Sequence, residues 1–169
     1  DNYTGIAGVA WHSRLMPLKV LSGTGSGNMA DLATAIWYAA NNGASVINMS
    51  LGSYGESQAV KAALLNAYSV LCPVAAAGND SYKVDPVAPP NNTYAPMFPG
   101  CYPFVIGVEA SMPEGSTAPF SNIDPSGFKF VSNDFGHNYE VMAPGVNIMS
   151  TFPGGTYRSL NGTSMAAPI

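Results

Sequence analysis

Three short apolar strands, separated by two helical patterns, constrain the fold more than any other feature of the chain. Residues 16–21, 44–49 and 71–77 are compact apolar runs, and residues 29–42 and 57–69 between them have helical spacing. Strands that are apolar almost throughout are typical of a sheet covered on both faces, and strands joined through helices are parallel. The order therefore predicts a doubly wound α/β fold, with a mostly parallel sheet and helices on both faces.

The two predicted helices each carry an apolar stripe. In the first, Leu32, Ile36 and the Ala39/Ala40 pair recur at helical spacing, and Gly43 is expected to end the helix as a C-terminal cap. The second helix is expected to turn one side toward the core. That side carries Val60, Leu64, Leu65 and Tyr68.

The second half of the chain is richer in proline and in turns. Residues 80–103 contain six prolines and few periodic apolar positions, which indicates a long ordered loop. Residues 104–109 resume as a strand, and residues 111–138 are expected to be mostly turns around short β segments. Further short strands are expected at 139–143 and 147–150, and a last helix is expected to begin at Gly162-Thr163-Ser164.

The size and the ends of the chain predict part of one domain. At 169 residues the length suits a single domain, and no internal repeat is visible. The first five residues lack the basic start and apolar run of a signal peptide, and Pro168-Ile169 stops inside an expected helix. We therefore expect residues 1–169 to form a single partial domain, incomplete at both ends, with the missing N-terminal and C-terminal parts as its natural partners.

Composition excludes several classes of function. The net charge is -4, charged residues make up 9% of the chain, and no basic run offers a footprint for phosphates, which argues against nucleic-acid binding. A hydrophobic content of 47% argues against disorder. The longest apolar stretches, at 36–40 and 70–77, fall far short of the roughly 20 residues that a membrane span requires.

The remaining single motifs are weak on their own. The loop after the first strand follows the pattern Gly23-x-Gly25-x-x-Asn28, which lacks the third glycine of a dinucleotide site and the Gly-Lys-Ser/Thr of a P-loop. Cys72 and Cys101 are compatible with one disulfide or with two unrelated thiols, and their spacing supports no zinc site. His12 and His137 are isolated in sequence and are best interpreted as surface or core-edge residues.

Two polar positions are better placed for chemistry. Asn79 follows a buried strand directly, at the end where open α/β sheets place their binding crevices, although an Asn after Gly is also a common turn former. Ser164 lies at an expected helix start among small residues, where its hydroxyl would be exposed near backbone N–H groups that can receive an oxyanion. A serine or threonine that merely caps the helix is the alternative.

Four segments, taken together in their order along the chain, point to one family. They resemble those of the subtilisin-like serine peptidases in sequence, order and approximate spacing, and the resemblance runs from Gly5 to Ile169. The segments are Val46-Ile47-Asn48-Met49-Ser50-Leu51-Gly52, Val74-Ala75-Ala76-Ala77-Gly78-Asn79, Met142-Ala143-Pro144-Gly145-Val146 and Asn161-Gly162-Thr163-Ser164-Met165-Ala166-Ala167-Pro168.

The resemblance implies a serine endopeptidase and assigns its site. Ser164 matches the nucleophile, and Asn79 matches the side-chain donor of the oxyanion hole. Residues 22–27 lie where the family has its S4-side loop. Ser50, Leu51 and Gly52 match the strand that pairs with an extended polypeptide substrate and forms one wall of the S1 pocket. Ala76, Ala77 and Gly78 match another part of that pocket.

The resemblance also implies what this chain lacks. In the family the catalytic Asp and His precede all four segments, and neither His12 nor His137 matches that His, so the chain alone is expected to be nearly inert. Asn2 and the backbone around Thr4 and Ile6 resemble part of the family's calcium loop, but the upstream carboxylate is absent, so no bound cofactor is assigned and calcium belongs at most to the full-length protein. The family implies secretion or display at the cell surface. A non-catalytic module that binds peptides or has a structural role is the alternative.

Overall fold

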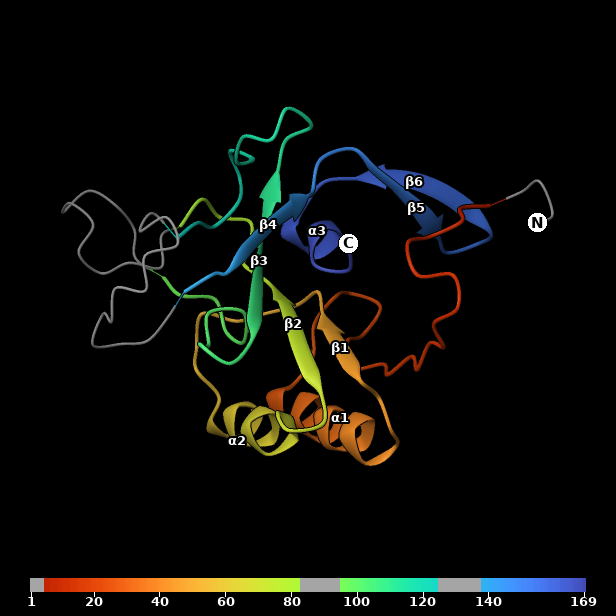
Figure 1. Cartoon of the computed structure of the whole chain (residues 1–169). Helices are drawn as coiled ribbons and strands as arrows, with labels where there is room; N and C mark the ends of the chain where they lie inside the picture. The colour runs from red at the N-terminus through yellow and green to blue at the C-terminus, as the bar shows by residue number, and fades with distance from the viewer. Residues whose placement is uncertain (1–4, 83–94, 125–137) are drawn as a thin grey trace.

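A four-stranded parallel sheet forms the centre of the molecule. The structure is a computed structural model that describes residues 5–82, 95–124 and 138–169, and its strands follow the order β1 (Val46–Met49), β2 (Cys72–Ala76), β3 (Ile106–Ser111) and β4 (Val141–Pro144). All three neighbouring pairs are parallel. Their carboxyl ends therefore meet at one edge of the sheet (Figure 1), as the predicted fold requires.

Helices cover the two faces of this sheet. Helices α1 (Met29–Asn41) and α2 (Gln58–Ala67) lie side by side on one face, whereas the short helix α3 (Thr163–Ala166) packs against β2, β3 and β4. The alternation of side chains in and beyond β2 separates the two layers: Ala75 and Ala77 belong to the cluster with α1 and α2, and Ala76 belongs to the cluster with α3. The predicted doubly wound α/β class is thus confirmed.

The ends of α1 follow from two residues. The side chain of Asn28 accepts hydrogen bonds from the backbone N–H groups of Ala30 and Asp31, at 2.6 and 3.2 Å, and so caps the N-terminus. Gly43 has a φ of +80°, and the Ala44 N–H reaches back to the Ala39 carbonyl at 3.0 Å. This Schellman arrangement confirms the predicted cap. Glycine suits the position because the left-handed conformation costs it little.

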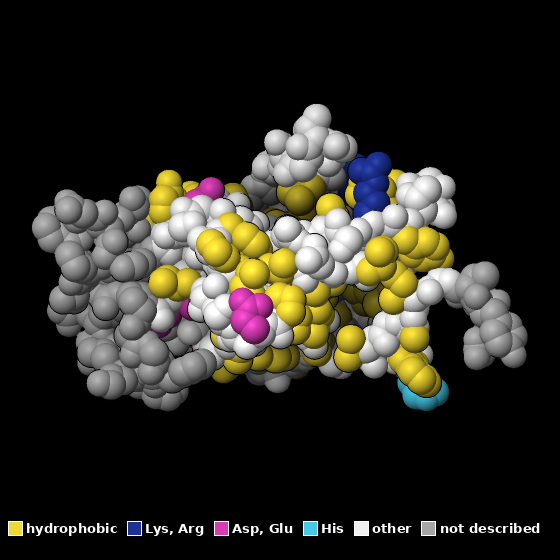
Figure 2. All heavy atoms as spheres, turned by 90° about the horizontal axis from the view of Figure 1, so that it is seen from above, with side chains coloured by type: hydrophobic (Ala, Val, Ile, Leu, Met, Phe, Trp, Pro, Cys, Tyr) yellow, Lys and Arg dark blue, Asp and Glu magenta, His cyan; other side chains and the backbone are white. Residues whose placement is uncertain are grey.

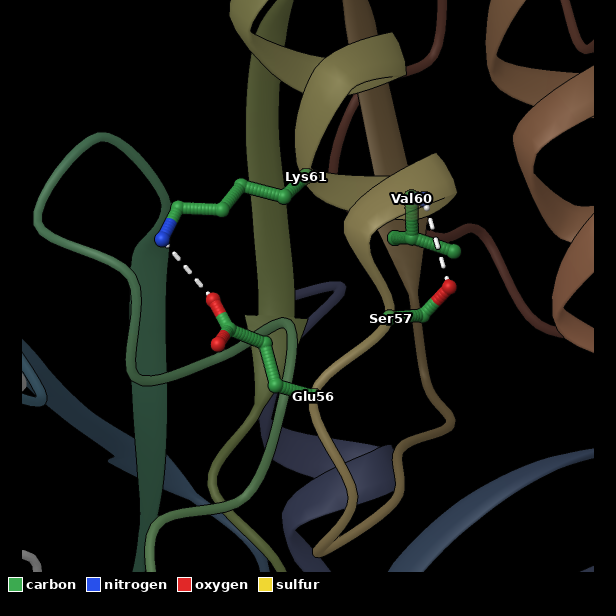
Figure 3. A network of polar contacts seen from close by, with 4 residues as sticks. All are labelled: Glu56, Ser57, Val60 and Lys61. Carbon is green, nitrogen blue, oxygen red and sulfur yellow. Dashed lines mark hydrogen bonds and ion pairs between the residues drawn. The ribbon is translucent and has the colours of Figure 1, made fainter.

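The N-terminus of α2 is fixed by polar contacts (Figure 3). Ser57 Oγ accepts a hydrogen bond from the Val60 N–H at 3.4 Å, and Lys61 Nζ forms an ion pair with Glu56 at 2.8 Å. The predicted apolar side is confirmed for Val60 and Leu64 but not for Leu65 and Tyr68, which are exposed. Ala63 and Ala67 lie on the core face instead, where their small side chains let α1 and α2 approach each other. The buried residues of α2 are Val60, Ala63, Leu64 and Ala67.

The prediction of a strand at residues 16–21 is wrong. In the described part of the chain this segment makes one isolated bridge, between Leu21 and Gly27, and does not join the sheet. Pro17 has no N–H to donate to a ladder, and the turn closed by the Ser22 N–H and the Ser26 carbonyl, 2.8 Å apart, holds the end of the segment locally.

The last strands form a hairpin that the sequence patterns indicated only in part. Strand β5 (Ile148–Phe152) pairs antiparallel with β6 (Thr156–Leu160), and β6 was not expected. Gly154 and Gly155 both have positive φ between the two strands, so the Gly-Gly pair was the available signal. The other expected strands and helices lie within two residues of their predicted bounds.

Both cysteines are free thiols. Cys72 is exposed at the start of β2, whereas Cys101 is buried, and burial raises the pKa of its thiol. Of the two alternatives, the structure contains the two separate thiols. Within the described residues, none of the helices is long and apolar enough to cross a bilayer.

Two half-buried carboxyl groups make stability depend on pH. Burial raises the pKa of Glu109 and of Glu140 to about 7, against the hydrogen bonds that they accept from Asp124 N and Gly107 N. The folded state then binds protons that the unfolded state has already released, so the free energy of unfolding should fall as pH rises from about 4.5 to about 7.

We predict that Glu109→Gln flattens this dependence by on the order of 1 kcal/mol, after allowance for solvent screening, because Gln keeps the acceptor oxygen but does not ionise. Urea unfolding at pH 5 and pH 7.5 measures the difference. The exposed Glu114→Gln is the control. An unchanged pH profile in Glu109→Gln would contradict the prediction.

Candidate functional site

Ser164 lies at the start of α3, against the segment that follows β1. Its Oγ donates a hydrogen bond to the Ser50 carbonyl at 3.2 Å, and the Ser50 hydroxyl donates to the Ser164 carbonyl at 2.8 Å. Asn48 Nδ2 in turn donates to Ser50 Oγ at 3.0 Å. Two segments 114 positions apart are therefore joined reciprocally, and the Ser164 side chain is half-buried at the carboxyl edge of the sheet.

Asn79 is bound to the residue before Ser164. Its Oδ1 accepts hydrogen bonds from Thr163 N at 2.8 Å and from Thr163 Oγ1 at 3.0 Å. Thr163 Oγ1 also accepts from the Gly78 N–H at 3.1 Å, and the Thr163 side chain is fully buried. Because a backbone N–H can only donate, the amide oxygen of Asn79 must face Thr163. The NH₂ group is therefore the end of this exposed side chain that is free to donate to a ligand.

The backbone before Ser164 needs glycine. Gly162 has φ and ψ near +154° and +157°, a conformation essentially restricted to glycine, and its N–H donates to the Gly145 carbonyl at 2.8 Å. A Cβ on Gly145 would lie 2.5 Å from Ala110 Cβ, so glycine is needed there for close packing. The segment at 142–146, to which the sequence patterns assigned no function, thus supports the turn that carries Ser164.

Asn122, which no sequence pattern singled out, holds the loop that carries Asn79. Its side chain is fully buried, and its Oδ1 accepts from the backbone N–H groups of Asp80 and Tyr82, at 3.1 and 2.9 Å. Its Nδ2 donates to the Ala77 carbonyl at 2.9 Å. One amide therefore satisfies backbone groups on both sides of Asn79, and a serine-asparagine pair in a turn carries no signal that would have predicted this.

Tyr54 extends this network to the segment after β1. Its hydroxyl donates to the Asp80 carboxylate and accepts from Asn122 Nδ2 at 3.1 Å. Burial is the main cause that raises the pKa of Tyr54 to about 12, so the hydroxyl remains a donor at neutral pH. The loops after β1 and β2 are thereby tied together beside Asn79.

The residues expected to bind substrate lie around this edge. Ser50 and Leu51 are half-buried and Gly52 is exposed, whereas the second segment, Ala76, Ala77 and Gly78, is buried. Gly78 has a φ of +107°, and a Cβ on it would lie 2.3 Å from Asn122 Nδ2, so only glycine fits there. Gly52 and Gly78 both face the Met97 side chain, which the sequence patterns did not indicate.

Figure 2 shows this edge from the side where β1 to β4 end: hydrophobic and uncharged side chains prevail, and few are charged.

The loop at 22–27 borders an open hollow of about 460 Å³ beside Lys19 and Asp31. His12 is exposed, and His137, Asn2 and Thr4 lie outside the described residues. Within the described ranges, no three His, Cys, Asp or Glu side chains are grouped so as to hold a metal ion.

We predict that Asn122→Ala loosens the 78–82 loop, because it leaves the Asp80 and Tyr82 N–H groups without an acceptor. The free energy of unfolding should fall by about 2–4 kcal/mol, and both amides should exchange with solvent faster. Urea unfolding and hydrogen exchange measure the two effects. Asn66→Ala, which removes an exposed helix side chain, is the matched control. Unchanged exchange at both amides would show that Asn122 does not hold this loop.

Comparisons with known proteins show the family of the chain. The sequence model of the Subtilase family matches residues 1–169. Subtilisin DY from Bacillus licheniformis is 42% identical over 99% of this chain and 55% of its own length, and subtilisin E from Bacillus subtilis is 38% identical over 99% of this chain and 39% of its own. The chain thus spans about half the length, or less, of these relatives.

Solved structures of other proteins also resemble this chain in fold. Sphericase matches with a TM-score of 0.72 and 32% identity, over 88% of this chain and 49% of that one. A cold-adapted subtilisin-like serine proteinase matches with a TM-score of 0.71 and 29% identity, over 89% of this chain and 48% of that one. With a match over its whole length and four ordered motifs, the chain belongs to the subtilase family of serine peptidases.

Proposed function

We propose that this chain supplies the nucleophile and the oxyanion hole of a secreted or surface-displayed endopeptidase that cleaves polypeptides by acyl transfer. Ser164 Oγ attacks the peptide carbonyl, and the tetrahedral oxyanion is held between the Asn79 amide and the Ser164 N–H. The single observation that carries the proposal is the pair of hydrogen bonds from Thr163 to Asn79 Oδ1, since they turn the amide NH₂ outward beside the nucleophile.

The substrate is proposed to bind as an extended strand beside Ser50, Leu51 and Gly52. A peptide that binds as an added strand needs open backbone groups at the edge of a strand and room for its alternate side chains. Small side chains at this edge leave that room. Ala76, Ala77 and Gly78 would form the other wall of the pocket.

The general base is proposed to come from the part of the family's domain that this chain does not span. The Ser164 hydroxyl donates to the Ser50 carbonyl, which cannot accept the proton during attack, so the hydroxyl stays a weak nucleophile without an added imidazole. The same observation favours a second candidate, a non-catalytic module that binds peptides through this edge. The two differ in whether a longer protein containing this chain reacts at Ser164.

We predict that a longer protein containing this chain, its catalytic base included, is labelled by a serine-directed fluorophosphonate, and that Ser164→Ala abolishes the labelling. Ser159→Ala, on the exposed strand β6, should leave it intact. The 169-residue chain alone should react only when a complementary fragment is added. Intact mass measures each case, and a label on any other residue would refute Ser164 as the nucleophile.

We also predict that Asn79→Ala in the longer protein lowers kcat by about 10²–10³-fold with little change in KM, because the amide acts on charge that develops in the transition state. The magnitude is the one known for the oxyanion-hole asparagine of subtilisin itself, a member of the same family. Asn66→Ala should leave kcat unchanged. A rise in KM with unchanged kcat would instead assign Asn79 to ground-state binding.

A further inference from the structure

Met97 lies between Gly52 and Gly78, which belong to the two proposed walls of the substrate site. A Cβ built on Gly52 would lie 2.6 Å from Met97 Sδ and 2.7 Å from its Cγ, and a Cβ built on Gly78 would lie 2.8 Å from Met97 Cε. The middle of the side chain therefore contacts one wall and its tip contacts the other. The space that two glycines would otherwise leave open is filled by a residue of the same chain.

Backbone hydrogen bonds hold Met97 and its neighbours in this position. Its N–H donates to the hydroxyl of buried Tyr139 at 3.1 Å, and its carbonyl accepts from the Cys101 N–H at 3.0 Å. The next residue, Phe98, is paired with Ser53 through two hydrogen bonds of 2.8 Å. Because Ser53 directly follows Gly52, the backbone of Met97 is tied to the wall that its side chain contacts.

We propose that Met97 is the specificity-determining residue of this site and restricts it to substrates with a small uncharged side chain, such as glycine, alanine or serine, before the scissile bond. The inference rests on the proposed function, which places that side chain between Ser50–Gly52 and Ala76–Gly78.

The chemistry of the walls supports this class. The six wall residues and Met97 carry no charge, so a charged substrate side chain would lose its water without gaining a partner. A large aromatic side chain would have to displace Met97 and forfeit its contacts with Gly52 and Gly78. A small uncharged side chain has no charge to desolvate and leaves Met97 in place.

The test uses the longer protein that contains this chain and its general base, with peptides that differ only in the residue before the scissile bond, alanine or phenylalanine. The wild type should cleave the alanine peptide with the higher kcat/KM. Met97→Ala should raise kcat/KM for the phenylalanine peptide by roughly 10–200-fold and change the alanine peptide little. Met97→Leu, of similar volume, should keep the preference, and so should Met149→Ala, a matched change on exposed β5.

Fluorophosphonate labelling of Ser164 in every variant separates the specificity of the site from its catalytic competence. If Ser164 is labelled but the wild type prefers phenylalanine, or Met97→Ala leaves the ratio unchanged, Met97 does not set the specificity and the proposed function stands. Absence of labelling in the wild type overturns both. Should Met97→Ala fail to fold in a thermal melt, Met97→Val must shift the ratio in the same direction, and an unchanged ratio overturns the inference.

Discussion

The contact between Thr163 and the loop after β2 is the interaction on which the rest of the site depends. Thr163 is fully buried, donates twice to Asn79 Oδ1 and accepts from the Gly78 N–H. It thereby joins the start of α3 to the carboxyl end of a central strand. Without these bonds the Asn79 amide could rotate freely, and the buried Thr163 hydroxyl would lose its partners at a cost of about 1–3 kcal/mol.

Small residues make this contact possible. Gly78 must approach Asn122, Gly145 must approach Ala110, and the alternating Ala75, Ala76 and Ala77 let layers pack on both faces of β2. Because these residues are small, they leave space at the edge of the sheet that larger side chains would fill. Met97 then fills part of this space, so packing of the loop before β3 decides the shape of the proposed pocket.

Much of the fold was predictable because it follows from local patterns. Apolar strands bounded by helical stripes predicted the parallel sheet, and Gly43 predicted the end of α1. Residues 16–21 were misassigned because an apolar run does not reveal whether a partner strand is available, and Pro17 removes a donor. Tyr68 was misassigned because the α1–α2 contact selects Ala63 and Ala67 for the interior.

The sequence by itself determined the fold class, the family and the two residues, Ser164 and Asn79, proposed for catalysis, because each depends on short motifs whose residues are neighbours in the chain. Only the tertiary structure decided which way the Asn79 amide turns, that Asn122 holds its loop, and that Met97 lies between Gly52 and Gly78. Those contacts join residues tens of positions apart. Their geometry depends on how the layers pack, and no local pattern along the chain encodes that.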